Sequence, residues 1–438
     1  MWEKLLRPVT QYRGLPRPVY VLFLSRVVTA LGMFVGPMMT LILTLKYGLS
    51  AATAGAIITG ASLGAGLCSI LGGRIADRAS RKWTMILFQS LSALIFIVCA
   101  FLSPLYGSAS PDAPAWPMIG LLILAYLVGA LGGPAGEALM MDLTEPKNRK
   151  VAYSLSYMGF NFGFAFGAAL AGFLFKDHLF WVFAGDALTT LLSLALIALF
   201  IPDAHRKTAA ELASDAAGER GLEKAVTGSL WSVLKARPIL PLFALVFALY
   251  QFCYSNWAFL LPLQMGQLFG ADGARYQGLL ASLNGVVVIS LTPLLVHWMR
   301  KMQPLSAMAI GGVLFTASYF TLGASRVFPL FLFAIFVFSA GEVTFTILQS
   351  VFIASQTPSS HRGRISATVS LIAGAGWSVG PVVSGLIAQT TSASFTWNAV
   401  GVVMVFAVVG LLLLKRLEKP VAPEAEGAEG DLAGVAGE

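Results

Sequence analysis

Long apolar stretches recur along the whole chain and constrain its fold more than any other feature of the sequence. A helix needs about 20 apolar residues to cross a bilayer core, and twelve stretches of that order lie near residues 18–44, 52–75, 83–104, 117–141, 151–175, 178–201, 238–263, 277–297, 305–324, 329–353, 365–388 and 395–414. Charged residues make up only 11% of the chain, against about 25% in soluble domains. We therefore predict an all-α integral membrane protein with 12 transmembrane helices.

The positions of the basic residues predict the orientation of these helices. Of the 29 Lys and Arg residues, 24 lie at the two termini or in the loops on the same side of the membrane, and four lie in the opposite loops. Basic residues in short loops mark the cytoplasmic side, so we expect a multi-pass cell-membrane protein with both termini in the cytoplasm. Contacts with anionic lipid headgroups account for the net charge of +8 without nucleic acid.

The residues that usually carry catalysis or bind metals are dispersed. Cys68, Cys99 and Cys253 all lie inside predicted spans, where small buried apolar side chains are the expected role. The four histidines are scattered over loops and span ends, and the chain contains no phosphate-binding Gly-x-x-x-x-Gly-Lys-Ser/Thr loop. We predict no catalytic site, no metal and no cofactor, and expect an ion gradient rather than ATP as the energy source.

The chain divides into two similar halves. We predict an amino-terminal six-helix bundle over 1–201, a cytoplasmic central loop over 202–237, a carboxy-terminal bundle over 238–414 and a disordered acidic tail over 415–438. An offset of 213 residues superimposes one arginine and three glycines of the fifth span on their counterparts in the eleventh. These two spans are therefore predicted to be equivalent helices of a pseudo-symmetric pair.

The loop after the second span carries the most specific motif. It reads Gly-x-x-x-Asp-Arg-x-x-Arg-Lys, with Gly73, Asp77, Arg78, Arg81 and Lys82 at the defining positions. This spacing resembles the signature loop of the major facilitator superfamily, although a serine stands where the family usually has a glycine. The resemblance implies two six-helix bundles that rock between inward-open and outward-open states, with Asp77 in a latch that stabilises the outward-open state.

Small residues four apart in the fifth and eleventh spans predict close helix packing. The fifth span resembles the antiporter motif of the family but lacks its proline, whereas the eleventh span keeps it. Generic helix packing explains the pattern equally well. The predicted packing residues are Gly163, Gly167, Gly172, Gly376, Gly380, Pro381 and Gly385.

The segment from Gly136 to Lys150 and the Gly341-Glu342-Val343 triplet are similar to drug:proton antiporters of the LmrP-like multidrug-efflux branch. Two features depart from that branch. The fourth span lacks the arginine common there, and the seventh span places Tyr254 and its neighbours where an acidic residue is usual.

Charged residues inside the bilayer are functional candidates because burial there is costly. Glu342 lies near the middle of the tenth span, where a carboxyl that gains and loses a proton could couple transport to a gradient. Glu137 and Arg26 are expected to form either a static ion pair or part of a proton relay. Asp142 has either a coupling role or a structural one at the helix end, and Asp186 either serves coupling or reaches the surface.

Amphipathic side chains in the carboxy-terminal half predict the walls of a substrate cavity. Aromatic rings bind flat or cationic ligands by stacking and cation–π attraction, although those near the span ends could instead anchor the helices at the interface. The candidate cavity residues are Tyr250, Gln251, Tyr254, Asn256, Trp257, Asn161, Asn284, Gln349 and Trp377.

Taken together, the motifs favour a monomeric secondary transporter that exports small hydrophobic or cationic compounds in exchange for protons. Its expected partners are that substrate, protons and membrane lipids. The alternative is a proton-coupled transporter of one defined metabolite, peptide or lipid. A membrane enzyme and a channel have less support, because neither clustered catalytic residues nor a selectivity filter is present in the sequence.

Overall fold

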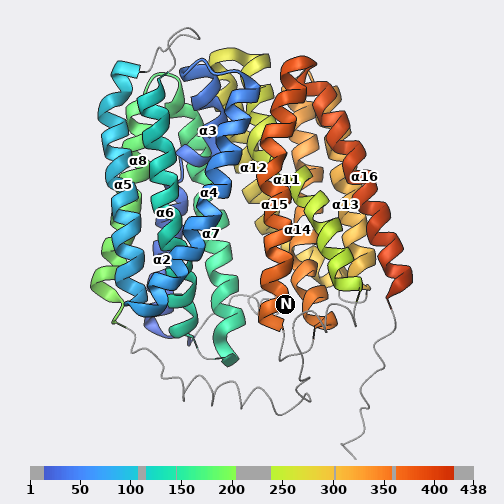
Figure 1. Ribbon diagram of the computed structural model, residues 1–438, viewed down its shortest axis with the longest axis horizontal. Coiled ribbons are helices and arrows are strands. Elements are labelled where there is room, and N and C mark those ends of the chain that lie inside the picture. The colour runs from blue at the N-terminus through green and yellow to red at the C-terminus, as the bar shows by residue number, and fades with distance from the viewer. Residues whose placement is uncertain are drawn as a thin grey trace, which may run out of the picture.

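The computed structural model describes residues 14–106, 115–144, 146–203, 238–299, 302–357 and 362–418. Most of the predicted central loop and of the predicted tail lies outside these residues. The described chain is helical (Figure 1), with elements α2 (Arg17–Leu31), α3 (Val35–Leu41), η1 (Ile42–Lys46), α4 (Ala51–Arg78), α5 (Arg81–Tyr106), α6 (Trp116–Asp142), α7 (Pro146–Phe175), α8 (Leu179–Phe200), α11 (Ile239–Phe269), η3 (Gly270–Asp272), α12 (Gly273–Met299), α13 (Pro304–Ala324), α14 (Phe328–Gln356), α15 (Arg362–Thr390) and α16 (Ala393–Leu417).

The helices are long and apolar enough to cross a membrane. Over the described residues, 11 stretches meet that description, and the longest, Ile239–Met299, has 61 residues. At 1.5 Å per residue a single helix of that length would be about 90 Å long, three times the hydrocarbon core. The stretch instead contains α11 and α12, which reverse direction at Gly270, where φ is +55°. Counted separately, these two helices give the predicted set of 12 crossings.

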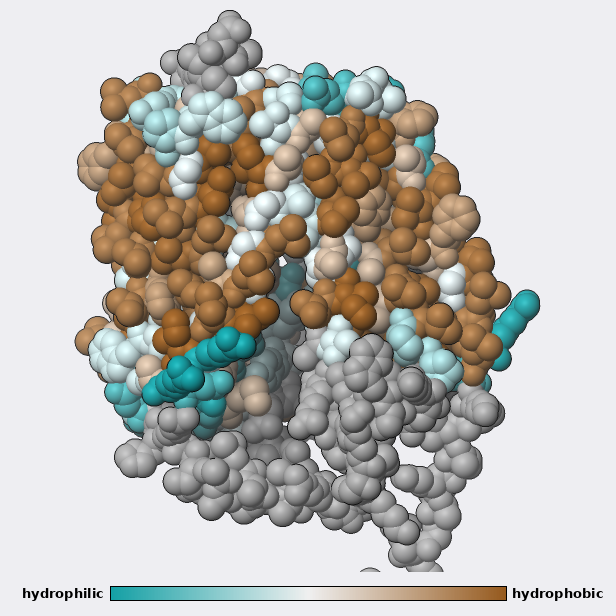
Figure 2. All heavy atoms as spheres, viewed as in Figure 1, coloured by the Kyte–Doolittle hydropathy of each residue, from teal (hydrophilic) through white to brown (hydrophobic). Residues whose placement is uncertain are grey.

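The helices form two groups that stand side by side (Figure 1). One group contains α2 to α8 and the other contains α11 to α16. Both groups present apolar side chains to the outside, such as Leu199 of α8 and Phe406 of α16, which are 76% and 64% exposed. Figure 2 shows this brown surface on the near face of both groups, as expected for side chains that face lipid.

The glycines of the internal repeat occupy equivalent places in the two halves. Gly163 and Gly167 pack against the backbone of α2, and Gly376 and Gly380 pack against α11, which is the first helix of the other half. A Cβ on Gly172 would lie 3.2 Å from the carbonyl carbon of Ala274, and one on Gly385 would lie 3.1 Å from that of Ala51. The two halves therefore use matched small residues to approach each other.

The first span is broken, which differs from the continuous span predicted over 18–44. Helix α2 ends at Leu31, and α3 starts at Val35. Pro37 explains the break, because a proline removes the helical hydrogen bond to the carbonyl four residues earlier and its ring clashes with that group. The carbonyl in question belongs to Met33, which lies within the break.

The halves touch from near the middle of α7 and α12 to the ends of the helices away from the loop that joins α4 and α5. We call the end that carries Arg74, Arg78, Lys415 and Arg416 the basic end, and the opposite one the far end. At the far end Lys176 lies 3.2 Å from Asp272. Figure 2 shows the surface hollowed between the halves toward the basic end.

Two backbone contacts hold the far end together. The backbone N–H of Ala52 donates to Gln389 at 3.1 Å, and the N–H of Val382 donates to the Thr59 hydroxyl at 3.2 Å. Both join the outer parts of α4 and α15. The described helices therefore have the arrangement of a two-bundle protein closed at its far end.

Candidate functional site

The carboxyl group of Glu342 lies at the centre of a hydrogen-bonded cluster that joins three helices of the carboxy-terminal half. The Tyr254 hydroxyl, from α11, donates to one oxygen of Glu342 at 2.6 Å. The Asn284 amide, from α12, donates to the other oxygen at 2.7 Å and to the Ser339 hydroxyl at 2.9 Å. Glu342 is partly exposed, and both of these partners are neutral, so the cluster supplies no counter-charge to its anion.

Aromatic rings surround this cluster. The ring of Tyr254 lies 5.5 Å from that of Trp377 on α15 and 5.7 Å from that of Phe338 on α14. Trp257 also stacks on Phe338, at 5.0 Å. The predicted cavity residues Tyr254, Trp257, Asn284 and Trp377 are thus gathered around Glu342, in an environment suited to a flat or cationic ligand.

The remaining predicted cavity residues have different surroundings. Gln251 and Gln349 are partly exposed. Tyr250 is 3% exposed and stacks on Phe345 at 3.5 Å, and Asn256 is fully buried. In this conformation Tyr250 and Asn256 pack inside the carboxy-terminal bundle, and their contact with a substrate stays a prediction.

Asn161 lies on α7 and is 8% exposed. Its amide donates to the Tyr157 carbonyl at 2.9 Å, which is a bond within its own helix. The backbone of Asn161 faces Gly285 of α12. Asn161 therefore lies where the two halves approach each other, near the middle of both helices.

Arg26 and Glu137 are brought together in the amino-terminal half, as the sequence predicted. The guanidinium of Arg26 lies 3.8 Å from the Glu137 carboxylate, with about half of each side chain exposed. It also lies 5.4 Å from the centre of the Phe160 ring. This long, accessible pair leaves both groups able to exchange partners, so the choice between a static pair and a relay stays open.

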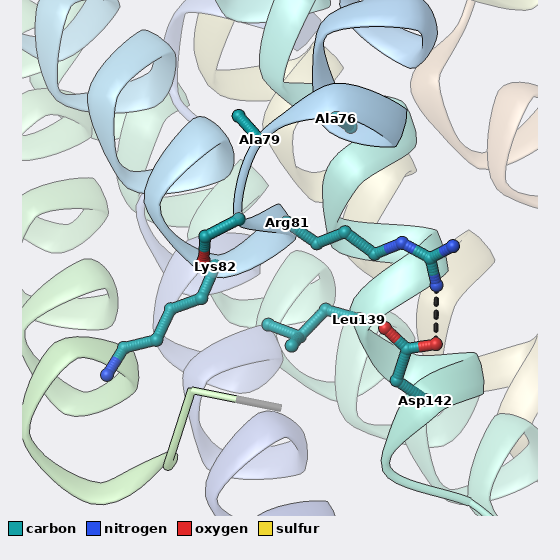
Figure 3. A pocket seen from close by; sticks show the side chains of 7 residues that line it. Ala76, Ala79, Arg81, Lys82, Leu139 and Asp142 are labelled. Carbon is teal, nitrogen blue, oxygen red and sulfur yellow. Dashed lines mark hydrogen bonds and ion pairs between the residues drawn. The ribbon is translucent and has the colours of Figure 1, made fainter. Parts of the chain in front are cut away.

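Asp142 pairs with a residue of the signature loop. Arg81 forms an ion pair with Asp142 and donates to the Ala138 carbonyl at 3.3 Å. Figure 3 shows the two side chains meeting beside a small pocket that Ala76 and Leu139 also line. The sequence did not reveal this contact between α5 and α6.

The other end of the signature loop is tied to α8. The Lys82 ammonium donates to the Ala198 and Ile201 carbonyls at 2.9 and 2.7 Å, which places a cation at the negative end of the helix dipole. Asp203 accepts from the Ser80 hydroxyl and from the Trp83 indole, both at 2.9 Å. The hydrogen bond from Ser80 has the larger effect and that from Trp83 the next, and both lower the pKa of Asp203.

The predicted latch residues divide into two groups. The observed partners of Arg81 and Lys82 belong to the amino-terminal half, so these two residues brace α4, α5, α6 and α8 against one another. Gly73 is partly exposed, and Asp77 and Arg78 are exposed at the basic end. A latch from Asp77 to the other half stays a prediction for a different conformation.

Asp186 is neither at the surface nor in the Glu342 cluster. Its carboxylate accepts hydrogen bonds from the backbone N–H groups of Phe34 and Val35 at 3.1 and 3.0 Å. It therefore satisfies N–H groups that the break between α2 and α3 leaves without helical partners. The side chain also lines a cavity of about 310 Å³.

Sequence reasoning missed several residues that shape the site. Phe338, Phe345 and Ser339 lie on the same helix as Glu342, but each reads as an ordinary apolar or small residue of a membrane span. Spacing along α14 was the available signal, because residues three or four positions from Glu342 share its face. Asp203 and Trp83 were missed because they bond to each other across 120 residues of sequence.

Two six-helix halves packed side by side, each with partly buried carboxyl groups among its apolar helices, have the architecture of a membrane transporter. The family model of the Major Facilitator Superfamily matches residues 22–311 and again residues 243–437. The chain belongs to the major facilitator superfamily and is a multi-pass membrane transporter. The two overlapping matches agree with the internal repeat.

The relatives are transporters of different kinds. The chain is 26% identical to the uncharacterized MFS-type transporter YqjV of Bacillus subtilis (strain 168), over 72% of this chain and 73% of the relative. It is 24% identical to a Na(+), Li(+), K(+)/H(+) antiporter of Planococcus maritimus, over 75% of this chain and 79% of the relative.

Solved structures share the fold at low sequence identity. The POT family transporter PepTSo has a TM-score of 0.68 at 16% identity, covering 92% of this chain and 98% of that one. A bacterial homologue of the human lysosomal transporter Spinster, in an inward-facing and occupied conformation, has a TM-score of 0.70 at 14% identity, covering 91% and 96%. At these identities the likeness concerns the fold alone.

Proposed function

We propose that this transporter exports hydrophobic cations in exchange for protons, with Glu342 as the group that binds the proton. The observation that carries the proposal is the setting of Glu342. Its carboxyl is held by Tyr254 and Asn284, faces aromatic rings and receives no counter-charge from either hydrogen-bonding partner. A proton or a cationic substrate would each supply that charge, and competition between them couples their movements.

The basic end is the cytoplasmic side in this proposal. The structure is then open to the cytoplasm, where a substrate for export would enter. One proton that crosses a membrane potential of about 100 mV gains about 2.3 kcal/mol. Because 1.4 kcal/mol corresponds to a factor of ten, that energy supports roughly fifty-fold accumulation even before a pH gradient is counted.

The test is gradient-driven transport in proteoliposomes. The wild-type chain and Glu342→Gln are reconstituted, a pH gradient is imposed, and movement of tetraphenylphosphonium is followed. We expect the wild type to move the cation and Glu342→Gln to lose gradient-driven transport by at least tenfold, while it still exchanges cation for cation.

Asp177→Asn is the matched control, because it removes the carboxylate of an exposed residue between α7 and α8. This variant should transport as the wild type does. A wild-type protein that moves no lipophilic cation under any gradient would refute the proposed substrate class. Normal gradient coupling in Glu342→Gln would refute the role of Glu342.

A second candidate is exchange of alkali cations for protons, which the antiporter of Planococcus maritimus favours. The side-chain oxygens of Tyr254, Ser339 and Glu342 lie in the same cluster and are ligands of the kind that alkali cations accept. Adding Na⁺, Li⁺ or K⁺ to the same proteoliposomes distinguishes the candidates. Proton release driven by these ions, and not by tetraphenylphosphonium, would favour this alternative.

A further inference from the structure

A cavity beside the broken first span contains a carboxylate in an otherwise largely apolar wall. Its volume of about 310 Å³ is at the small end of the range of about 300–1,000 Å³ typical of ligand pockets. Met39, Ile58 and Ile123 contribute to the apolar wall, and Asp186 contributes the acidic group. Among the described residues that line this cavity, none is Lys, Arg or His.

The carboxylate of Asp186 is only partly satisfied by the protein. One oxygen, Oδ2, accepts the backbone N–H groups of Phe34 and Val35, which holds the side chain in place and offsets part of its charge. An isolated carboxylate in a poorly polar environment is unfavourable unless a cation or a proton neutralises it. The cavity can therefore accommodate one positive charge, carried by a proton or by a bound cation, beside this group.

The chemistry of the wall selects the kind of cation. An alkali ion needs several oxygen ligands, and besides Asp186 the side-chain oxygens in the wall are those of Ser62 and Tyr126. Phe96, Tyr126 and Trp377 instead offer aromatic rings, which attract organic cations. An ammonium group with an apolar body matches both the charge and the wall.

The cavity lies next to the Glu342 cluster. Trp377 lines the cavity, and its ring lies 5.5 Å from that of Tyr254, which donates to Glu342. The rings of Trp377 and Tyr254 therefore connect the wall of this cavity to Glu342. The cavity and the proposed coupling group are linked by these two aromatic residues.

We propose that this cavity is a second binding site, which takes a compact organic ammonium ion with Asp186 as its counter-charge. Its meaning for transport rests on the proposed function, but its existence does not. The site lies mainly in the amino-terminal half, between α3, α4, α5, α6 and α8, and is closed on one side by Trp377.

The experiment measures equilibrium binding to the full-length chain in lipid nanodiscs, without a gradient. The probe is phenyltrimethylammonium, and benzenesulfonate, which has the same ring and the opposite charge, is the control ligand. We expect the cation to bind and the anion not to bind. Asp186→Asn, whose amide oxygen can still accept the two backbone N–H groups, should remove binding at this site, so that Asp186→Asn combined with Glu342→Gln should bind the cation at least tenfold more weakly than Glu342→Gln alone.

A second pair of variants tests the cavity without touching its charge. Ala61→Phe places a ring in the cavity that Ala61 lines and should also weaken binding at least tenfold. Ala56→Phe is its matched control, since Ala56 lies on the same helix but is exposed, and it should bind as the wild type does. This pair decides the question if Asp186→Asn fails to fold.

The outcomes separate this site from the Glu342 cluster. Glu342→Gln should keep binding within twofold, whether or not Glu342 couples protons to transport. Equal affinity in Glu342→Gln with and without Asp186→Asn, or wild-type affinity in a folded Ala61→Phe, would overturn the proposal. Loss of binding in Glu342→Gln with full binding in Asp186→Asn would overturn it too, because the cation would then bind only at Glu342.

Discussion

At the residue scale, the signature loop shows how single side chains acquire roles that their sequence neighbours do not reveal. Ser80, Arg81 and Lys82 are consecutive, yet their partners lie just after α8, on α6 and on α8. The bonds fix the positions of two helix ends, those of α6 and α8. A loop that the family resemblance associates with switching therefore also braces one half internally.

The bond network around Asp203 predicts a pH-dependent contact. Hydrogen bonds from Ser80 and Trp83 lower its pKa below the ordinary value of 3.8. A carboxylate with a lowered pKa keeps its contribution above the ordinary value and loses it as the pH falls through the lowered one. The Trp83–Asp203 contact should therefore persist at neutral pH and break only in acid.

Fluorine NMR on 5-fluorotryptophan-labelled protein measures this change, with Trp83→Phe identifying the signal among the nine tryptophans. The Trp83 signal should titrate with a midpoint below pH 3.8, and the transition should disappear in Asp203→Asn. Asp272→Asn should leave it unchanged. A midpoint at or above 3.8 would contradict the assigned hydrogen bonds.

At the residue scale, the charged residues of the site could be predicted from the sequence, whereas most of their hydrogen-bonding partners could not. Glu342 was recognisable because a carboxylate interrupts an apolar span, and burial makes that costly whatever surrounds it. Tyr254 and Asn284 were named as cavity residues, but nothing in the sequence joined them to Glu342. That contact depends on how three helices are packed, and hydropathy does not specify helix rotation.

At the element scale, small residues set how closely helices approach. Gly55 and Gly60 lie five positions apart on α4 and differ sharply in their surroundings. A Cβ on Gly55 would lie 2.9 Å from the carbonyl carbon of Pro381, which belongs to the other half, whereas one on Gly60 would meet nothing within 4 Å. Substitution by a larger residue should therefore impair the packing of the two halves at Gly55 and be tolerated at Gly60.

Gly55→Val should prevent closure at the far end, because the clash is with backbone that cannot move aside without moving α15. We expect transport to fall at least tenfold, with the population shifted toward the form open at the far end. Gly60→Val should retain transport within twofold. Spin-label distances across the far end would report the shift, and an unchanged distance in Gly55→Val would contradict the prediction.

The elements themselves were largely predictable, with one instructive exception. The spans follow from apolar length, because a bilayer permits few alternatives to a continuous helix. The break between α2 and α3 was not predicted, since the residues around it are as apolar as the rest of the span. Pro37 was a signal, but Pro104, Pro262 and Pro381 lie inside helices that continue, so proline alone does not identify a break.

At the scale of the whole molecule, the contact at the far end defines the conformation. Ala52 and Gln389 are joined by a 3.1 Å hydrogen bond across the two halves. In alternating access this contact must open once in each cycle. Fixing it should therefore stop transport without removing the binding sites.

The corresponding experiment joins Ala52→Cys and Gln389→Cys with a short bifunctional thiol reagent that a reductant can cleave, after the native Cys68, Cys99 and Cys253 have been replaced. We expect at least a tenfold loss of transport, retained binding of the cation, and recovery on reduction. A pair at Gln356 and Glu418, which are bonded within one half, is the control and should leave transport intact. Full activity with the far-end link in place would contradict this mechanism.

The matched glycine contacts have a mechanical consequence. The halves meet along two seams, α7 against α12 and α4 against α15, where Gly172 approaches Ala274 and Gly385 approaches Ala51. Two separate seams resist twisting and sliding of the halves while the far end is closed. Because the outer contacts of the α4–α15 seam, such as that of Ala52 with Gln389, must open in each cycle, we expect the halves to separate mainly by rotating about the inner parts of the seams. One well-chosen distance across the far end should then follow the opening.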